Sequence, residues 1–168
     1  MSEPEGNAAR ARQWRADAAV GIEDSRLILA GRATNLRNAA SLCQQSVEKL
    51  IKGFLVAHGI DFPKTHDIAR LLDEFVSPVD EELATAAEAA RQLSVYAVAA
   101  RYPDFDEAIG VDVARQLLDV AEEAWALFEP RIMELIAAEE IGQDESAATQ
   151  VAPDDDGDGG EDGGDAGH

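Results

Sequence analysis

Five side chains in this sequence have the chemistry needed to bind a phosphate or to move a proton: Lys49, Lys52, His66, Arg101 and Tyr102. The planar guanidinium of Arg101 suits two-pronged recognition of a phosphate, and the ring of Tyr102 can stack on a base. His66 can serve as a general base or as a phosphate ligand. If folding brought these groups to one cleft beside the two lysines, the site would suit a nucleotide or an RNA end.

Each of these residues also has a structural interpretation. Arg101 can form a salt bridge that fixes its own loop, and Tyr102 can lie half-buried with its hydroxyl at the surface. Lys52 stands four residues after Glu48, the spacing of an ion pair on the solvated face of a helix. His66 can make a hydrogen bond at the start of a helix. We favour the structural interpretation for Tyr102, His66 and either lysine alone, and both interpretations stay open for Arg101.

The region that carries both lysines has the clearest helical pattern. Apolar residues recur every three or four positions between residues 33 and 58, which predicts one long amphipathic helix. Glu48 and the two lysines lie away from the apolar stripe, and Gly59 is typical of the residue that follows a helix end. The stripe consists of Leu36, Ala40, Cys43, Val47, Leu50 and Phe54.

The remaining sequence predicts four further helices and no strand. One spans residues 13–30, and a short one starts after Thr65, a residue type that caps helix starts. Another begins near Pro78 and ends before Pro103, because proline suits the first turn of a helix but disfavours helical geometry in the residue before it. The last begins at Asp112. We therefore predict an all-α protein, an antiparallel bundle of four to five helices.

The chain divides into three parts of different composition. We predict a flexible N-terminus over residues 1–12, the helical bundle over residues 13–138 and a disordered acidic tail over residues 139–168. The tail contains 11 Asp and Glu and no Lys or Arg, so it cannot bury enough apolar surface to offset its chain entropy. A length of 168 residues fits one domain.

The chain is strongly acidic, with 34 Asp and Glu against 14 Lys and Arg and a net charge of -20. Residues 1–138 hold 23 of these acids and all 14 basic residues, which gives a charge of -9 outside the tail. An acidic surface repels phosphates, so broad RNA binding is disfavoured. A local basic groove is still compatible with this sum, because attraction within a Debye length depends on nearby charges.

The sequence favours a cytoplasmic protein with no membrane segment. Its N-terminus lacks the basic start and apolar run of a secretory signal, and no stretch has the roughly eighteen continuous apolar residues that span a bilayer. Cys43 is the only cysteine, so no intrachain disulfide forms. We expect no cofactor and no metal, because the chain has no glycine-rich phosphate loop and the acids of its tail lack the pattern of a calcium-binding loop.

Three segments together resemble the HEPN family of small helical domains. They read QQSVEKLIK over residues 44–52, HDI over residues 66–68 and RYPD over residues 101–104, and a long last helix follows. The resemblance covers residues 13–138 and implies an antiparallel bundle with an extra short helix, usually dimeric. It also implies a choice of functions, since some members are RNA-cutting toxins and others are inactive partners or nucleotide binders that accompany a small nucleotidyltransferase.

In the ribonuclease members of this family, an arginine and a histidine separated by four to six residues meet at a dimer cleft and act on RNA without a metal. At the corresponding distances after Arg101, this chain has Asp106, Glu107 and Ala108. A carboxylate cannot replace an imidazole that must carry positive charge beside a phosphate, and it repels the substrate. This departure from the motif argues against an enzyme.

Three functions are compatible with these observations. The first is a non-catalytic HEPN-type binding protein, for a nucleotide or for a small nucleotidyltransferase in a toxin–antitoxin-like module. The second is a divergent, metal-independent HEPN ribonuclease toxin that uses Arg101, and the third is a structural dimerisation or adaptor module. We favour the first. We also expect a C2 homodimer in which Asp104 and Asp106 hold the two Arg101 side chains, since like charges in one cleft need an anion between them.

Overall fold

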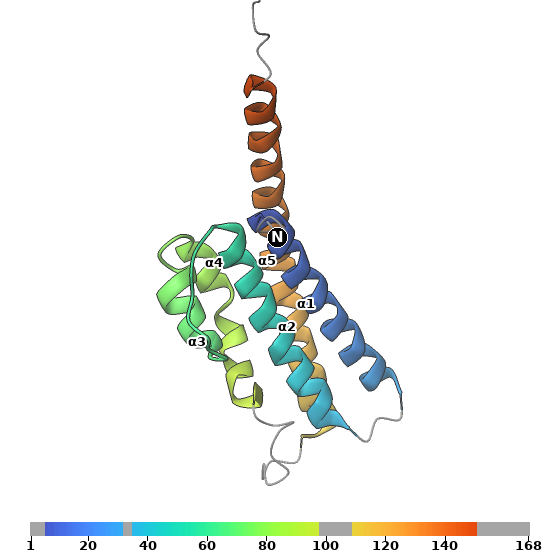
Figure 1. The fold of residues 1–168 in the computed structure, drawn as a ribbon. Helices are drawn as coiled ribbons and strands as arrows, with labels where there is room; N and C mark the ends of the chain where they lie inside the picture. The colour runs from blue at the N-terminus through green and yellow to red at the C-terminus, as the bar shows by residue number, and fades with distance from the viewer. Residues whose placement is uncertain (1–5, 32–34, 98–108, 151–168) are drawn as a thin grey trace, which may run out of the picture.

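The computed structural model describes residues 6–31, 35–97 and 109–150, and the regular elements within these ranges are all helical. Four short segments fill the chain between the second and the last long helix: α3 (Ile68–Leu71), the π-helical η1 (Leu72–Val76), α4 (Glu81–Ala86) and the 3₁₀-helical η2 (Glu88–Ala97). The three long helices lie side by side (Figure 1) and are α1 (Asn7–Ala30), α2 (Leu36–Ala57) and α5 (Val111–Gln150). The protein is an all-α bundle, as predicted.

α2 is the central helix of the bundle. It packs against α1 and α5 and also against η1 and η2, and α1 runs antiparallel to it (Figure 1). The predicted stripe is confirmed as core, because Cys43, Val47 and Leu50 are fully buried and Phe54 is 1% exposed. With neighbours on several sides, α2 is buried over most of its surface, and its buried residues include polar ones.

The end of α2 is closed by a glycine in the left-handed conformation. Gly59 has a φ of 68°, which glycine adopts without the strain that a Cβ would bring. The N–H groups of Gly59 and Ile60 donate to the carbonyls of Val56 and Leu55, both at 2.9 Å. These bonds fix the start of the segment 59–67, which leads from α2 to α3.

α1 and α2 approach each other closely at two glycines. A Cβ added to Gly21 of α1 would lie 2.2 Å from Oγ of Ser46, and one added to Gly53 of α2 would lie 3.0 Å from Cβ of Trp14. Interiors are packed too densely to absorb such overlaps without a shift. The two glycines therefore allow the short distance between α1 and α2 at two points along their contact.

α1 begins earlier than the sequence pattern predicts. It starts at Asn7 instead of residue 13, and Ala8 and Ala11 of its first turns are buried. The expected flexible N-terminus is therefore helical from Asn7 onward. The pattern missed these turns because they contribute alanines to the core, and alanine adds little to hydrophobic periodicity.

α5 continues well past the predicted end of the bundle. It runs to Gln150, so the predicted onset of disorder at residue 139 is not what the structure shows, while residues 151–168 lie outside the described part of the chain. The last turns of α5 project beyond the other helices (Figure 1). An ion pair between Arg12 and Glu140 joins this part of α5 to α1. No helix in the described ranges is long and apolar enough to cross a membrane.

Two of the short helices between α2 and α5, namely α3 and α4, start at aspartates. Asp67 caps α3 by accepting a hydrogen bond from the N–H of Arg70 at 3.2 Å, whereas the sequence pattern placed the cap at Thr65. Asp80 caps α4 in the same way, at 2.8 Å, and α4 begins at Glu81, three residues after the predicted start at Pro78. An aspartate serves these caps well, because its carboxylate both accepts the bond and faces the positive end of the helix dipole.

Candidate functional site

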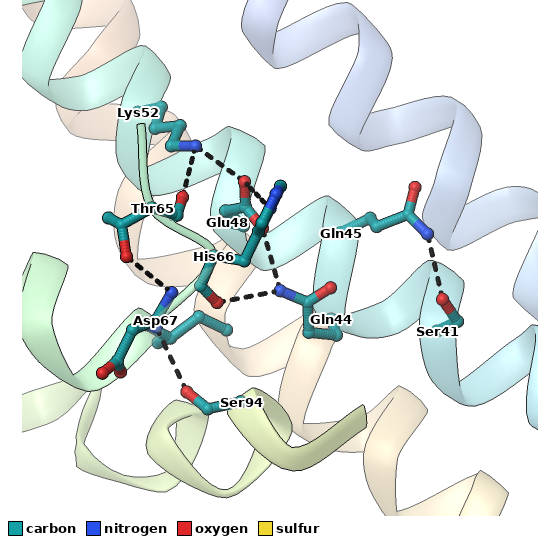
Figure 2. Close-up of polar contacts among 10 residues, drawn as sticks. Ser41, Gln44, Gln45, Glu48, Lys52, Thr65, His66, Asp67 and Ser94 are labelled. Atoms are coloured by element: carbon teal, nitrogen blue, oxygen red, sulfur yellow. Dashed lines mark hydrogen bonds and ion pairs between the residues drawn. The ribbon is translucent and has the colours of Figure 1, made fainter. Parts of the chain in front are cut away.

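Glu48 of α2 lies in the interior of the molecule, where only 6% of its surface is exposed. Lys52, one turn later, is 7% exposed, and its Nζ lies 2.7 Å from Oε1 of Glu48 (Figure 2). Sequence reasoning placed this ion pair on a solvated face, and that placement is wrong, because the segment 59–67 covers this side of α2. A charge taken out of water needs an opposite charge and hydrogen bonds to its remaining atoms.

The covering segment supplies part of those hydrogen bonds. Nζ of Lys52 donates to the carbonyl of Thr65 at 2.8 Å, and Nε2 of Gln44 donates to the carbonyl of His66 at 3.3 Å. Nε2 of Gln44 also lies 2.9 Å from Oε2 of Glu48, to which it donates. The segment is thus fastened to α2 at two points. We call Gln44, Glu48, Lys52, Thr65 and His66 the Glu48 cluster.

The imidazole of His66 completes the Glu48 cluster. Its Nδ1 lies 3.1 Å from both carboxylate oxygens of Glu48, yet 60% of the His66 side chain is exposed (Figure 2). When Nδ1 carries the hydrogen and donates it to the carboxylate, Nε2 is left to accept a proton or, in the charged ring, to donate to a phosphate. The residues that the structure describes make no hydrogen bond to Nε2.

Glu48 is ionised in the folded protein at neutral pH. Burial by itself would raise the pKa of Glu48, but hydrogen bonds from Lys52, Gln44 and His66 outweigh burial and hold that pKa below its ordinary value. The carboxylate is therefore a fixed negative charge. It neutralises Lys52 and sets the orientation of the His66 ring.

A further hydrogen bond joins the start of α3 to η2. The N–H of Ile68 donates to Oγ of Ser94 at 3.1 Å (Figure 2). η2 ends at Ala97, four residues before Arg101 in the chain. The Glu48 cluster is therefore connected through Ser94 to the element that precedes the RYPD segment.

The structure brings together two of the five predicted site residues. Lys52 and His66 both contact the carboxylate of Glu48. Arg101 and Tyr102 lie outside the described residues. The part of the predicted site that the structure describes is thus a charge-compensated cluster with one exposed imidazole.

Lys49 lies apart from this cluster. Its Nζ is 3.9 Å from a carboxylate oxygen of Asp17 on α1, and its side chain is 35% exposed. Gln45, on the same helix, donates from Nε2 to Oγ of Ser41 at 2.9 Å (Figure 2). Lys49 and Lys52 do not form a joint basic patch, because the two ammonium groups have different carboxylate partners.

Sequence reasoning did not assign Gln44 to the site and treated Glu48 only as a surface partner of Lys52. One signal could have found both residues, since Gln44, Glu48 and Lys52 follow one another at intervals of four. Such spacing places three hydrogen-bonding side chains in a row on one side of a helix. A row of this kind can hold a neighbouring segment that has no regular structure of its own.

A second polar group lines a cavity of about 400 Å³ between α2, α4 and α5. Nε of Arg131 donates to a carboxylate oxygen of Asp80 at 3.0 Å, and His58 lies in the same cavity. Burial lowers the pKa of His58, against a smaller opposing effect of Asp80. Arg131 and Asp80 are thus paired with each other, and Asp80 also caps α4. Within the described ranges, no three His, Cys, Asp or Glu side chains are grouped to hold a metal ion.

Comparison with known proteins assigns the family. No curated protein and no solved structure matches this chain. The family model described as HEPN domain matches residues 11–131, which include α2, the Glu48 cluster, most of α1 and the first half of α5. The match covers well over half of the 168 residues and agrees with the motif resemblance. This chain belongs to the HEPN domain family.

Proposed function

We propose that this HEPN protein is a non-catalytic binding protein that holds a nucleotide or a small nucleotidyltransferase partner in a toxin–antitoxin-like module. The observation that carries the proposal is that one carboxylate, that of Glu48, contacts both Lys52 and His66. Lys52 therefore has its negative partner inside the protein and is not available to an anionic ligand. What is left for a ligand is one oriented imidazole and, by the family resemblance, Arg101. These two groups suit one phosphate, but they are few for a polyanion on a chain with a net charge of -20.

The geometry of His66 supports binding of a single phosphate group. The carboxylate of Glu48 contacts Nδ1 of the ring, while most of the His66 side chain faces solvent. A ring already fixed in place loses little rotamer freedom when a ligand binds. Nε2 of His66 can then donate one directed hydrogen bond to a phosphate oxygen, and Arg101 is the residue we propose for a second contact.

The sequence around Arg101 supports a role in binding over a role in cleavage. The positions where the ribonuclease members carry their histidine are Asp106, Glu107 and Ala108. Two of these side chains repel a phosphodiester, and none of the three supplies an imidazolium. A compact ligand held mainly by directed hydrogen bonds tolerates this surrounding charge better than an RNA strand does.

We also propose a C2 homodimer, with the two copies of Arg101 brought to one cleft and held by Asp104 and Asp106. Such a contact is supported by exposed apolar side chains that come shortly before residue 98 and shortly after residue 108 in the sequence. Val95 of η2 is 59% exposed, and Val111 of α5 is 43% exposed. Burial of apolar side chains like these against a second copy would be favourable.

Thermal unfolding of the full chain with and without nucleotides tests the proposal. A bound nucleotide should raise the melting temperature, because a ligand at about 100 times its Kd stabilises the folded state by roughly 2.7 kcal/mol. His66→Gln and Arg101→Gln should abolish the rise, while Arg115→Gln, the same change at an exposed position of α5, should keep it. If no nucleotide raises the melting temperature and no co-expressed nucleotidyltransferase co-purifies with the chain, the proposal fails.

The contact between Glu48 and His66 also favours a second candidate function, a divergent ribonuclease. A carboxylate that holds one nitrogen of an imidazole can prepare the other nitrogen for proton transfer, and Arg101 would hold the phosphate. Purified protein would then cleave RNA without added metal, and both His66→Ala and Arg101→Ala would stop the cleavage. RNA that stays intact over prolonged incubation excludes this candidate.

A further inference from the structure

A small pocket lies between the start of α1 and the turn that follows α2, and its lining does not include His66. It encloses about 270 Å³, slightly less than the roughly 300 Å³ at which drug-sized ligand sites begin. Asn7 and Arg10 contribute to it from α1, and Gly59 and Asp61 contribute from the turn. These two segments lie at the same end of the bundle, because α1 and α2 are antiparallel (Figure 1).

The aromatic part of the pocket is formed by Trp14 and Phe62, both half-buried. Nζ of Lys52 lies 6.0 Å from the ring centroid of Trp14 and 5.8 Å from that of Phe62. A positive charge therefore already stands beside both rings. It would repel a second cation placed over them, so the rings favour an uncharged, apolar part of a ligand.

Two opposite charges on the rim of this pocket have no partner. Arg10 and Asp61 are both exposed, and neither makes an ion pair or a side-chain hydrogen bond with any residue that the structure describes. The structure shows no ion pair between the two either. By contrast, six other arginines are each paired with a carboxylate: Arg12, Arg15, Arg26, Arg70, Arg91 and Arg131.

We propose that this pocket binds a small zwitterion with an apolar body, namely a free α-amino acid with an aromatic or aliphatic side chain. Arg10 pairs with the ligand carboxylate through its guanidinium, and Asp61 pairs with the ligand ammonium. The ligand side chain packs against Trp14 and Phe62. This site is separate from the nucleotide site proposed above, and neither proposal depends on the other.

The charge of the whole chain favours a zwitterion over an anion at this position. With a net charge of -20, the chain repels a free phosphate ester or dicarboxylate before any contact is made. A zwitterion has no net charge, so it approaches without this repulsion. Two unpaired groups of opposite sign in one small pocket match its two charged ends, whereas an anion would leave Asp61 unpaired and facing its own negative charge.

Isothermal titration calorimetry of the full chain with L-phenylalanine and L-leucine tests this proposal. We expect saturable binding of at least one of them, weakened roughly tenfold or more by either Arg10→Gln or Asp61→Asn, because each change removes a charge-assisted hydrogen bond. Matched controls lie outside the pocket: Arg115→Gln and Asp24→Asn make the same changes at exposed positions and should leave the affinity unchanged. Circular dichroism should confirm that all four variants remain folded.

Two analogues of phenylalanine show which pocket residue binds which charged end of the ligand. 3-Phenylpropionate lacks the ammonium group, so Asp61→Asn should not weaken its binding further, while Arg10→Gln should. Phenethylamine lacks the carboxylate and should show the reverse pattern. The proposal is overturned if neither amino acid binds saturably, or if the control variants weaken binding as much as the two pocket variants do.

Discussion

Nδ1 of His66 lies 3.1 Å from both carboxylate oxygens of Glu48, although the two residues are 18 positions apart in the chain. This contact links the central helix α2 to the segment that leads into α3. Because the same carboxylate is bonded to Lys52, a single buried charge organises the polar side of the bundle. If His66 binds a ligand as proposed, stability and ligand binding are coupled at Glu48.

Removal of this charge should destabilise the fold strongly. We expect Glu48→Gln to lower the free energy of unfolding by roughly 3–5 kcal/mol, because it leaves the ammonium of Lys52 buried without a counter-charge. Urea denaturation monitored by circular dichroism measures the change. The double variant Glu48→Gln/Lys52→Met should recover much of the loss, since it removes both charges. A loss below about 1 kcal/mol for Glu48→Gln would mean that the pair is solvated, as exposed pairs contribute no more than this.

The pH dependence of stability should report the same carboxylate. The folded protein holds the pKa of Glu48 below its ordinary value of 4.5, so the unfolded chain binds a proton at higher pH than the folded protein does. The contribution of Glu48 is therefore fully present above about pH 5 and is lost as the pH falls through the folded-state pKa. Between pH 6 and 3, urea midpoints of the wild type should fall more steeply than those of Glu48→Gln. Equal slopes would contradict the assignment.

The close contact of Gly21 with Ser46 predicts a coupled pair of substitutions. Gly21→Ala should lower the free energy of unfolding by about 1–2 kcal/mol, since overpacking costs roughly 1–3 kcal/mol and the better helix propensity of alanine returns up to about 1. Ser46→Ala should be neutral or stabilising, because its buried hydroxyl has no hydrogen-bond partner among the described residues. It also removes the oxygen that a Cβ at Gly21 would strike. In chemical denaturation, the double variant Gly21→Ala/Ser46→Ala should be at least as stable as the wild type. If the changes in unfolding free energy of the two single variants simply add in the double variant, the contact is refuted.

The proposed homodimer predicts the mass of the protein in solution. Light scattering at micromolar concentration should give twice the chain mass of 18.0 kDa. Val95→Asp should shift the protein toward the monomer, because it places a charge among the exposed apolar side chains of the proposed contact. The matched change Val79→Asp, at another exposed valine, should not. A monomer at all concentrations would remove the argument for a shared cleft at Arg101.

Hydrophobic periodicity was sufficient to predict the fold. The stripe on α2 that contains Leu50 and Phe54 is the core of the bundle, because burial of one helix face depends on spacing that the sequence displays directly. The length of α1 was not predictable in this way. Its first turns contribute small side chains, Ala8 and Ala11, whose burial depends on the neighbouring helices.

The candidate site was less predictable than the fold, because it depends on a segment without regular structure. Lys52 and His66 were identified from their chemistry, but the burial of Glu48 follows from the path of residues 59–67 across α2. The spacing of Gln44, Glu48 and Lys52 at intervals of four indicates that a segment can be held there, but it does not say which segment or along which path. The same limit applies to Lys49 and Lys52, which are three positions apart but have separate carboxylate partners on different segments.

Calorimetric titration of the full chain with ATP and AMP tests the central claim most directly, which is that this HEPN protein binds a nucleotide through His66 and Arg101. The account predicts saturable binding to the wild type, loss of that binding in His66→Gln and Arg101→Gln, and unchanged binding in Arg115→Gln. Absence of saturable heat with both nucleotides, or equal affinity of the wild type and the His66→Gln variant, would contradict it.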